Sequence, residues 1–148
     1  MAAFHRHDPA WRRAADHSGI FACPALAAED LLSRHTPTYA YEFNDENAPE
    51  RYLPSVGFPY GAAHESEVQY LFDLTNTPYP GPLTVRQQQL AHVMRQYWTN
   101  LAKSGDPSAQ WPRFASAREQ TMSLVPLDPG IETDYGAEHH CGFWAAAG

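Results

Sequence analysis

Apolar positions recur at helical spacing in two stretches of the chain. From about residue 20 to residue 34, four apolar side chains fall on one helical face, and this spacing predicts a helix: Ile20, Phe21, Leu31 and Leu32. A longer stretch begins at Thr84, which has the spacing of a capping box with Gln87, and Gly105 is placed to end it. Its apolar positions, three and four residues apart, predict a helix with one face in the core: Leu90, Val93, Met94, Tyr97, Trp98 and Leu101.

Two shorter segments have the composition of strands. Residues 38–43, TYAYEF, are apolar at nearly every position, which is typical of a strand buried on both faces. Residues 121–127, TMSLVPL, alternate in the manner of a strand, and AEHHCGFWAAA near the C-terminus indicates a short closing helix. Residues 1–15 have no clear period. We therefore expect a loose N-terminal segment, followed over residues 16–148 by one domain or a large piece of one.

His64 lies between a loop and a short amphipathic run. The loop follows residues 38–43 and is rich in Asn, Pro and Gly. After the histidine, Ser66 and Gln69 have the spacing of a second capping box, and the apolar positions that follow predict a helix: Val68, Leu71 and Phe72. A histidine in this position is either a polar surface residue or a general base, and the chemistry of its neighbours has to decide.

Charge and hydropathy narrow the classes of partner. The 148 residues carry a formal net charge of −7 and have no Lys/Arg cluster, which disfavours nucleic acid and anionic membranes as partners. No apolar run approaches the ~20 residues of a membrane-spanning helix, and the first residues lack the apolar core of a signal peptide. We expect a soluble chain, either cytoplasmic or secreted, with a small-molecule site or a protein partner.

The sequence offers no complete catalytic or metal site. The nucleophile elbow G-x-S-x-G is absent, because Pro59 stands where serine would be between Gly57 and Gly61. H-E-x-x-H is also missing, and the clusters rich in histidine have no second ligand pair at zinc-finger spacing, so we expect no metal site. These clusters are His5, His7 and Asp8, and His139, His140 and Cys141.

Two cysteines, Cys23 and Cys141, are too far apart in sequence for C-x-x-C redox chemistry. They are consistent with two buried thiols in a reducing compartment or with a disulfide in an oxidising one.

Five separated motifs occur in one order along the chain. The first is an Asp16, Phe21, Cys23 and Pro24 series, with one residue more than expected between Asp and Phe. It is followed by YAYEF, GAAHESEVQYLF, YWTNLAKSGDPS with QWP, and HHCGFW. Over residues 16–144 this series resembles the C-terminal portion of a type-B carboxylesterase, the cholinesterase-like branch of the α/β-hydrolases.

The resemblance implies roles for three residues around the histidine. In that family the triad histidine lies in a G-A-x-H-x-x-E context after the last central strand, and His64 matches this position. His64 is then the general base, and Glu67 matches a buried carboxylate that supports the histidine region through hydrogen bonds. Glu65 stands where the family usually carries a small residue. Its carboxylate would raise the basicity of His64 if it points into the site, whereas we expect it to point to solvent.

The resemblance also implies a fold, a disulfide and missing parts. The fold class is α/β: a C-terminal fragment of an α/β-hydrolase, mostly helical, with the last central strand and one or two antiparallel edge strands. Cys23 and Cys141 match cysteines that form a disulfide in the family. The triad serine and acid would lie upstream of this chain, whether it is a truncated, split or processed polypeptide.

On this reading the chain supplies the histidine of a serine esterase that hydrolyses carboxylic esters without a cofactor, and it is inactive alone. Its partners would be a small-molecule ester and either an N-terminal esterase portion or a second copy of the chain. The alternative is a non-catalytic interaction module or gene remnant that self-associates.

Overall fold

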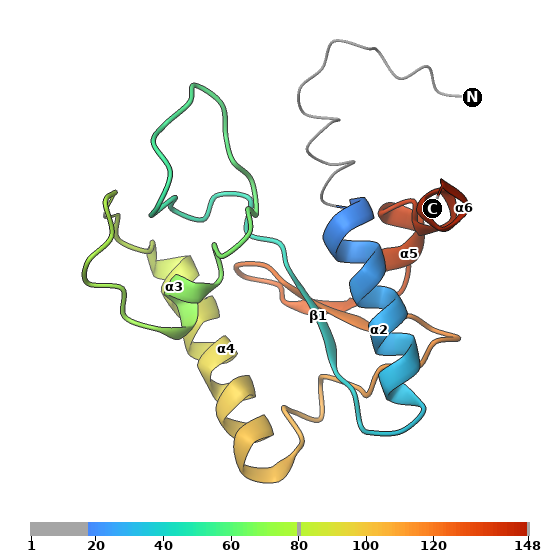
Figure 1. Ribbon diagram of the computed structural model, residues 1–148. Coiled ribbons are helices and arrows are strands. Elements are labelled where there is room, and N and C mark those ends of the chain that lie inside the picture. The colour runs from blue at the N-terminus through green and yellow to red at the C-terminus, as the bar shows by residue number, and fades with distance from the viewer. Residues whose placement is uncertain (1–17, 80, 148) are drawn as a thin grey trace. The chain divides into compact units, whose positions relative to one another are not determined.

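The computed structural model describes residues 18–79 and 81–147, with the backbone alone for Ala147, and they form two compact units (Figure 1). Of these residues, unit 1 comprises 18–38, 113–120 and 133–147, and unit 2 comprises 39–79, 81–112 and 121–132. Each unit is therefore assembled from segments that are distant in sequence. The expected N-terminal segment over residues 1–15 lies outside the described residues.

Unit 2 is built on a three-stranded sheet with the order β1-β2-β3. β1 (Ala40–Phe43) pairs in parallel with β2 (Thr121–Leu124), and β2 pairs antiparallel with β3 (Gly130–Glu132). Both expected strands are confirmed, although each is shorter than the sequence indicated. β2 is buried at all four positions, which fits its place in the middle of the sheet. The antiparallel edge strand is β3, which the sequence pattern did not reveal.

The long helix α4 (Val85–Ser104) has the ends that the sequence predicts. Thr84 and Gln87 form a reciprocal capping box, and Gly105 ends the helix with φ of 72°, a left-handed conformation that glycine adopts without strain. Its apolar face packs against the sheet, so that Leu90, Met94 and Tyr97 are buried, whereas the predicted core residue Leu101 is 40% exposed. The core cluster of unit 2 consists of Phe43, Tyr70, Leu90, Ala91, Met94, Tyr97, Trp111, Met122 and Leu124.

The helix after His64 is shorter than expected, and its predicted capping box is wrong. α3 spans only Val68–Leu71 and has no side-chain cap. Instead of capping the helix, the Gln69 amide donates to the carbonyls of Pro49 and Ser66 at 2.8 and 3.0 Å. The predicted apolar face is also rotated, because Tyr70 is fully buried while Phe72 is exposed.

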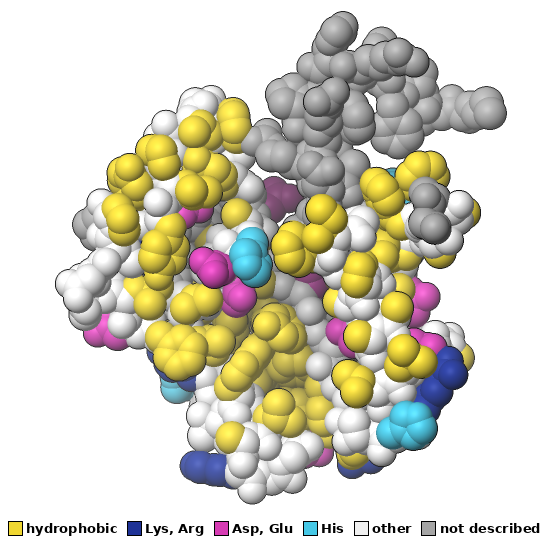
Figure 2. All heavy atoms as spheres, viewed as in Figure 1, with side chains coloured by type: hydrophobic (Ala, Val, Ile, Leu, Met, Phe, Trp, Pro, Cys, Tyr) yellow, Lys and Arg dark blue, Asp and Glu magenta, His cyan; other side chains and the backbone are white. Residues whose placement is uncertain are grey.

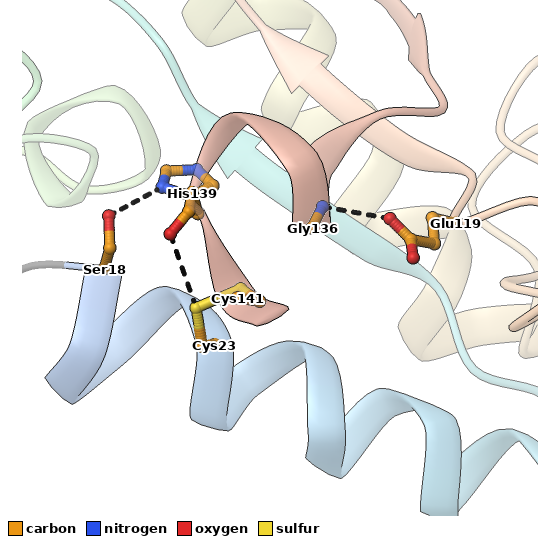
Figure 3. The surroundings of a disulfide bond; sticks show 6 residues. All are labelled: Ser18, Cys23, Glu119, Gly136, His139 and Cys141. Atoms are coloured by element: carbon orange, nitrogen blue, oxygen red, sulfur yellow. Dashed lines mark hydrogen bonds between the residues drawn. A yellow bond between two sulfur atoms is a disulfide. The ribbon is translucent and has the colours of Figure 1, made fainter. Parts of the chain in front are cut away.

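Unit 1 contains four short helical segments, and a disulfide joins two of them. They are η1 (Ser18–Ala22), a π-helical turn, α2 (Cys23–Ser33), α5 (Tyr135–Glu138) and α6 (Cys141–Ala147), which confirm both predicted helical regions. Figure 3 shows the bond between Cys23 and Cys141, whose Cα atoms lie 5.3 Å apart, and this confirms the pairing that the family resemblance implied. In the same view the Gly136 amide donates to the Glu119 carboxylate at 2.9 Å.

The apolar face of the first predicted helix is exposed. The four residues that define it, which lie on η1 and α2, are each about half exposed or more: Ile20, Phe21, Leu31 and Leu32. The periodicity therefore predicts the helix correctly. It does not identify a surface that covers the helix, because α2 has no buried residue within the described part of the chain.

Candidate active site

His64 lies on the long connection between β1 and α3 in unit 2 (Figure 1). The connection leaves the sheet at Asn44, whose amide still donates to the Leu124 carbonyl of β2 at 3.0 Å. It spans residues 44–67, and connections of this length in compact domains are uncommon and are usually either functional loops or linkers. We call these residues the histidine loop.

A buried carboxylate ties the two ends of the histidine loop together. Asp45, which is 3% exposed, accepts hydrogen bonds from the Tyr70 hydroxyl and, at 2.8 Å, from the Gln87 side-chain amide. It also accepts from the Asn47 backbone amide at 3.0 Å. Burial and the Asp45 carboxylate raise the pKa of Tyr70, so the phenol keeps its proton and remains a donor. The start of the loop, α3 and α4 are thereby joined at one point.

The middle of the loop has a second set of polar contacts. Glu50 accepts from three successive backbone amides, those of Arg51, Tyr52 and Leu53, at 2.8, 2.7 and 3.1 Å. Arg51 Nε in turn donates to the Gln69 side-chain oxygen at 2.7 Å. Because Gln69 also bonds Pro49, α3 holds the loop at two places besides Asp45. Many hydrogen bonds of this kind keep a loop in one conformation without a hydrophobic core of its own.

The turn that carries His64 depends on two residues with positive φ. Gly61 has φ of 70°, and its carbonyl accepts from the Ala63 amide at 2.9 Å. Glu65 also has φ of 70°, and it is followed by the Ser66 amide, which donates to Ala63 at 3.0 Å. The resulting turn presents the His64 side chain to solvent at 70% exposure. Histidine is the side chain most often used as a general base, and this one is open to an approaching reactant.

Glu65 departs from the small residue that the family usually carries, and the backbone gives a physical reason for that usual choice. A left-handed conformation is unstrained for glycine but costs about 1 kcal/mol or more for a residue with a side chain. The Glu65 carboxylate lies 4.0 Å from His64 Nε2 and is 60% exposed. Water screens an exposed pair of this kind, so the contact contributes little to stability.

Glu67 lies directly before α3 and is half-buried. Its charge, after the larger effect of burial, helps to raise the pKa of Tyr41 on β1. The role of Glu67 as a support for the histidine stays a prediction.

Two of the candidate metal ligands near the C-terminus, His139 and Cys141, make structural contacts in unit 1. His139 Nδ1 lies 3.2 Å from the Ser18 hydroxyl, and its ring packs against Tyr135 with centroids 4.4 Å apart. Cys141 is oxidised in the disulfide and so is not available as a thiolate ligand. The other cluster, His5, His7 and Asp8, and the Asp16 of the first motif lie outside the described residues.

Sequence reasoning did not identify Asp45, Gln69 in its observed role, or Arg51. Asp45 and Tyr70 are 25 residues apart, and no periodic pattern relates them. The only local signal is an acidic residue placed directly after a buried strand, which is also common in ordinary turns.

Comparisons with known proteins place these features in a family. The sequence profile of the carboxylesterase family matches residues 14–144. The chain is 28% identical over 138 residues to the acetylcholinesterase of Bungarus fasciatus, covering 87% of this chain and 21% of that protein. It is 29% identical over 133 residues to the cocaine esterase of Homo sapiens, covering 86% and 23%. With the acylcarnitine hydrolase of Rattus norvegicus it is 32% identical over 98 residues, covering 63% and 17%.

Solved structures agree with this assignment at the level of the fold. A thermophilic pNB esterase matches with a TM-score of 0.70 and 24% identity, covering 88% of this chain and 27% of that chain. A second pNB esterase structure matches with a TM-score of 0.59, 22% identity, and coverage of 79% and 24%. The fold is therefore part of an α/β-hydrolase. The chain belongs to the carboxylesterase family, and it spans about a fifth of the length of the curated relatives it matches. Within residues 18–79 and 81–147, none of the helices has the length and apolar character that crossing a membrane requires.

Proposed function

We propose that the chain is the histidine-bearing part of a carboxylic ester hydrolase, with His64 as the general base. The observation that carries this proposal is the solvent-facing position of His64 on a loop fixed by hydrogen bonds, directly after a strand of the parallel pair. In α/β sheets, ligands bind beyond the carboxyl ends of the parallel strands. Membership of the carboxylesterase family supports the same chemistry.

In the proposed reaction His64 takes the proton of a serine hydroxyl as the serine attacks the ester carbonyl, and returns it to the departing alcohol. It then takes a proton from water during hydrolysis of the acyl-enzyme. The serine and the acid are expected from outside these 148 residues, since G-x-S-x-G is absent from them and the chain spans only 17% to 27% of the relatives and solved structures named above. In this proposal Glu67 positions the histidine and is not the triad acid.

The surfaces left exposed fit a partner that completes the fold. In the sheet of the described residues β1 lies at one edge, and an edge strand presents unpaired backbone groups to another strand. Tyr41 of β1 is 40% exposed, and hydrophobic side chains gather over β1 and α4 on the face shown in Figure 2. We infer that an esterase portion bearing the serine and the acid covers this edge.

The proposal is tested by grafting residues 18–144 in place of the matched region of the thermophilic pNB esterase. The graft should hydrolyse p-nitrophenyl esters, and His64→Ala should reduce kcat by several orders of magnitude, as loss of a triad member does. Two exposed histidines serve as matched controls, because His35→Ala and His92→Ala should leave kcat unchanged. A folded graft whose activity is insensitive to His64→Ala would refute the assignment.

The non-catalytic alternative rests on the same exposed edge of β1. The 148-residue chain alone should have no esterase activity above background under either proposal, but only an interaction module would form a defined homo-oligomer without an esterase partner. Light scattering distinguishes the two. A stable monomer at micromolar concentration, with slow amide exchange along residues 39–43, would contradict both proposals for this edge.

A further inference from the structure

A cavity of about 450 Å³ in unit 2 combines two guanidinium groups with an apolar wall. Arg51 and Arg95 contribute the charge, and Asp73, which is exposed, adds one carboxylate to the lining. The apolar lining consists of Leu71, Phe72, Leu74 and Leu83. A pocket of this size holds a small ligand, and its few polar groups fix the orientation of that ligand.

Each of the two guanidinium groups is held in place by its own hydrogen bond to the protein. Its other donors remain available. Arg51 Nε donates to the Gln69 side-chain oxygen at 2.7 Å, and Arg95 Nη1 donates to the Tyr70 carbonyl at 2.8 Å. Gln69 is itself buried and bonded to Pro49. Each guanidinium has five N–H donors, so most of them remain for a ligand. No carboxylate of residues 18–79 and 81–146 forms an ion pair with either arginine.

Two oriented arginines with spare donors match the geometry of a planar anion. Carboxylates accept paired hydrogen bonds from guanidinium groups, and such charge-assisted bonds are stronger than neutral ones. The leucine and phenylalanine side chains beside them favour an apolar chain on the same ligand. We propose that this cavity, the arginine cavity, binds a carboxylate that carries a short apolar chain.

The arginine cavity adjoins the candidate active site. It shares Arg51, Gln69 and Leu74 with a much smaller cavity that is lined in part by His64 and Glu65. The anion site itself does not depend on the proposed function. Its connection with catalysis does rest on that function, since an ester hydrolase releases a carboxylic acid of this chemistry beside His64.

Binding of octanoate to the intact 148-residue chain tests the site, with amide resonances used to locate the ligand. Octanoate should shift the amide signals of residues 71–74 and 83, and octanol and acetate should each bind at least about tenfold more weakly. Octanol lacks the anion and acetate lacks the chain, so each removes one half of the recognition. Equal affinity for octanoate and octanol would overturn the proposal, and so would shifts confined to other residues.

Variants of the charged lining sharpen the test. Arg51→Gln and Arg95→Gln should each weaken octanoate binding about tenfold, and Asp73→Asn should strengthen it about two- to threefold. Arg86→Gln, on the exposed start of α4, is the matched control and should change nothing. Thermal melting of each variant checks that the fold is intact. Unchanged affinity in folded Arg51→Gln and Arg95→Gln would refute the site.

His64→Ala separates this inference from the proposed function, because octanoate binding should persist in that variant. Loss of octanoate binding in folded His64→Ala would refute the proposal that the arginine cavity binds the carboxylate. Inactivity of the esterase graft would count against the proposed function alone.

Discussion

The two units of the chain are stabilised by different means. Unit 2 has a hydrophobic core in which Tyr70, Met94 and Leu124 are completely buried, and aromatic rings such as Tyr97 and Trp111 pack with centroids 5.3 Å apart. Unit 1 has few buried residues, and the helix α2 has none. In place of a core it has a disulfide that joins residues 118 positions apart. The unit with the candidate site thus derives its order from packing, and the other from a covalent bond.

The largest expected effect is on unit 1. Replacing both cysteines, as Cys23→Ser with Cys141→Ser, should lower the free energy of unfolding by up to about 4 to 5 kcal/mol in the chain-entropy description of a loop this long. Native-state hydrogen exchange should show faster exchange along α2, while the amides of α4 remain protected. If α4 lost its protection to the same extent as α2, the contrast between the two units would be wrong.

A large-to-small substitution in the core should destabilise unit 2, whereas loss of the disulfide acts on unit 1. Met94 is completely buried, and Met94→Ala should reduce the free energy of unfolding of unit 2 by about 2–5 kcal/mol. Val85→Ala, on the same helix but 70% exposed, is the control and should stay within about 0.5 kcal/mol. Urea unfolding followed through the near-ultraviolet aromatic signal measures the loss in both variants. Equal losses in the two variants would show that the core does not hold this unit.

The histidine loop lies between these extremes, because it is part of unit 2 but is held mainly by polar contacts. Tyr70→Phe removes only the hydroxyl that donates to Asp45, and leaves a buried carboxylate with one donor fewer. We expect a loss of about 1–3 kcal/mol in the free energy of unfolding and faster amide exchange in residues 61–66. Tyr79→Phe, at an exposed tyrosine, is the control. Unchanged exchange around His64 in folded Tyr70→Phe would show that Asp45 does not fix the loop.

Local patterns in the sequence predicted the parts of the fold that local interactions decide. The capping box of Thr84 and Gln87 and the stop at Gly105 involve residues within one helix, so their spacing is sufficient. The disulfide was predicted from the family resemblance alone, because sequence spacing does not decide whether two distant cysteines meet.

The remainder depends on contacts between distant segments. Ser66 and Gln69 have the right spacing for a capping box, but Gln69 instead bonds Pro49, which is 20 residues away. α3 spans only Val68–Leu71 and has no side-chain cap. The apolar periodicity predicted the helix α2 correctly. Periodicity does not show what packs against the apolar face of a helix. His64 could be assigned to a loop from the sequence because that loop follows a recognisable strand. The contacts of Asp45 that hold the loop have no signal in the sequence.

The smallest expected effect is a pH dependence confined to unit 1. Burial raises the pKa of Glu29 on α2 from 4.5 to about 7, because the charged form is poorly solvated there. The unfolded chain then releases this proton at a lower pH than the folded one, so the stability of unit 1 should fall as pH rises from about 4.5 to about 7. Glu29→Gln should remove this dependence in hydrogen exchange of α2 and leave α4 unaffected. The effect should be modest, since the side chain is only half-buried. The exchange rates of α2 are compared after correction for their intrinsic pH dependence. If the remaining pH dependence is the same in Glu29→Gln as in the native chain, another group is responsible.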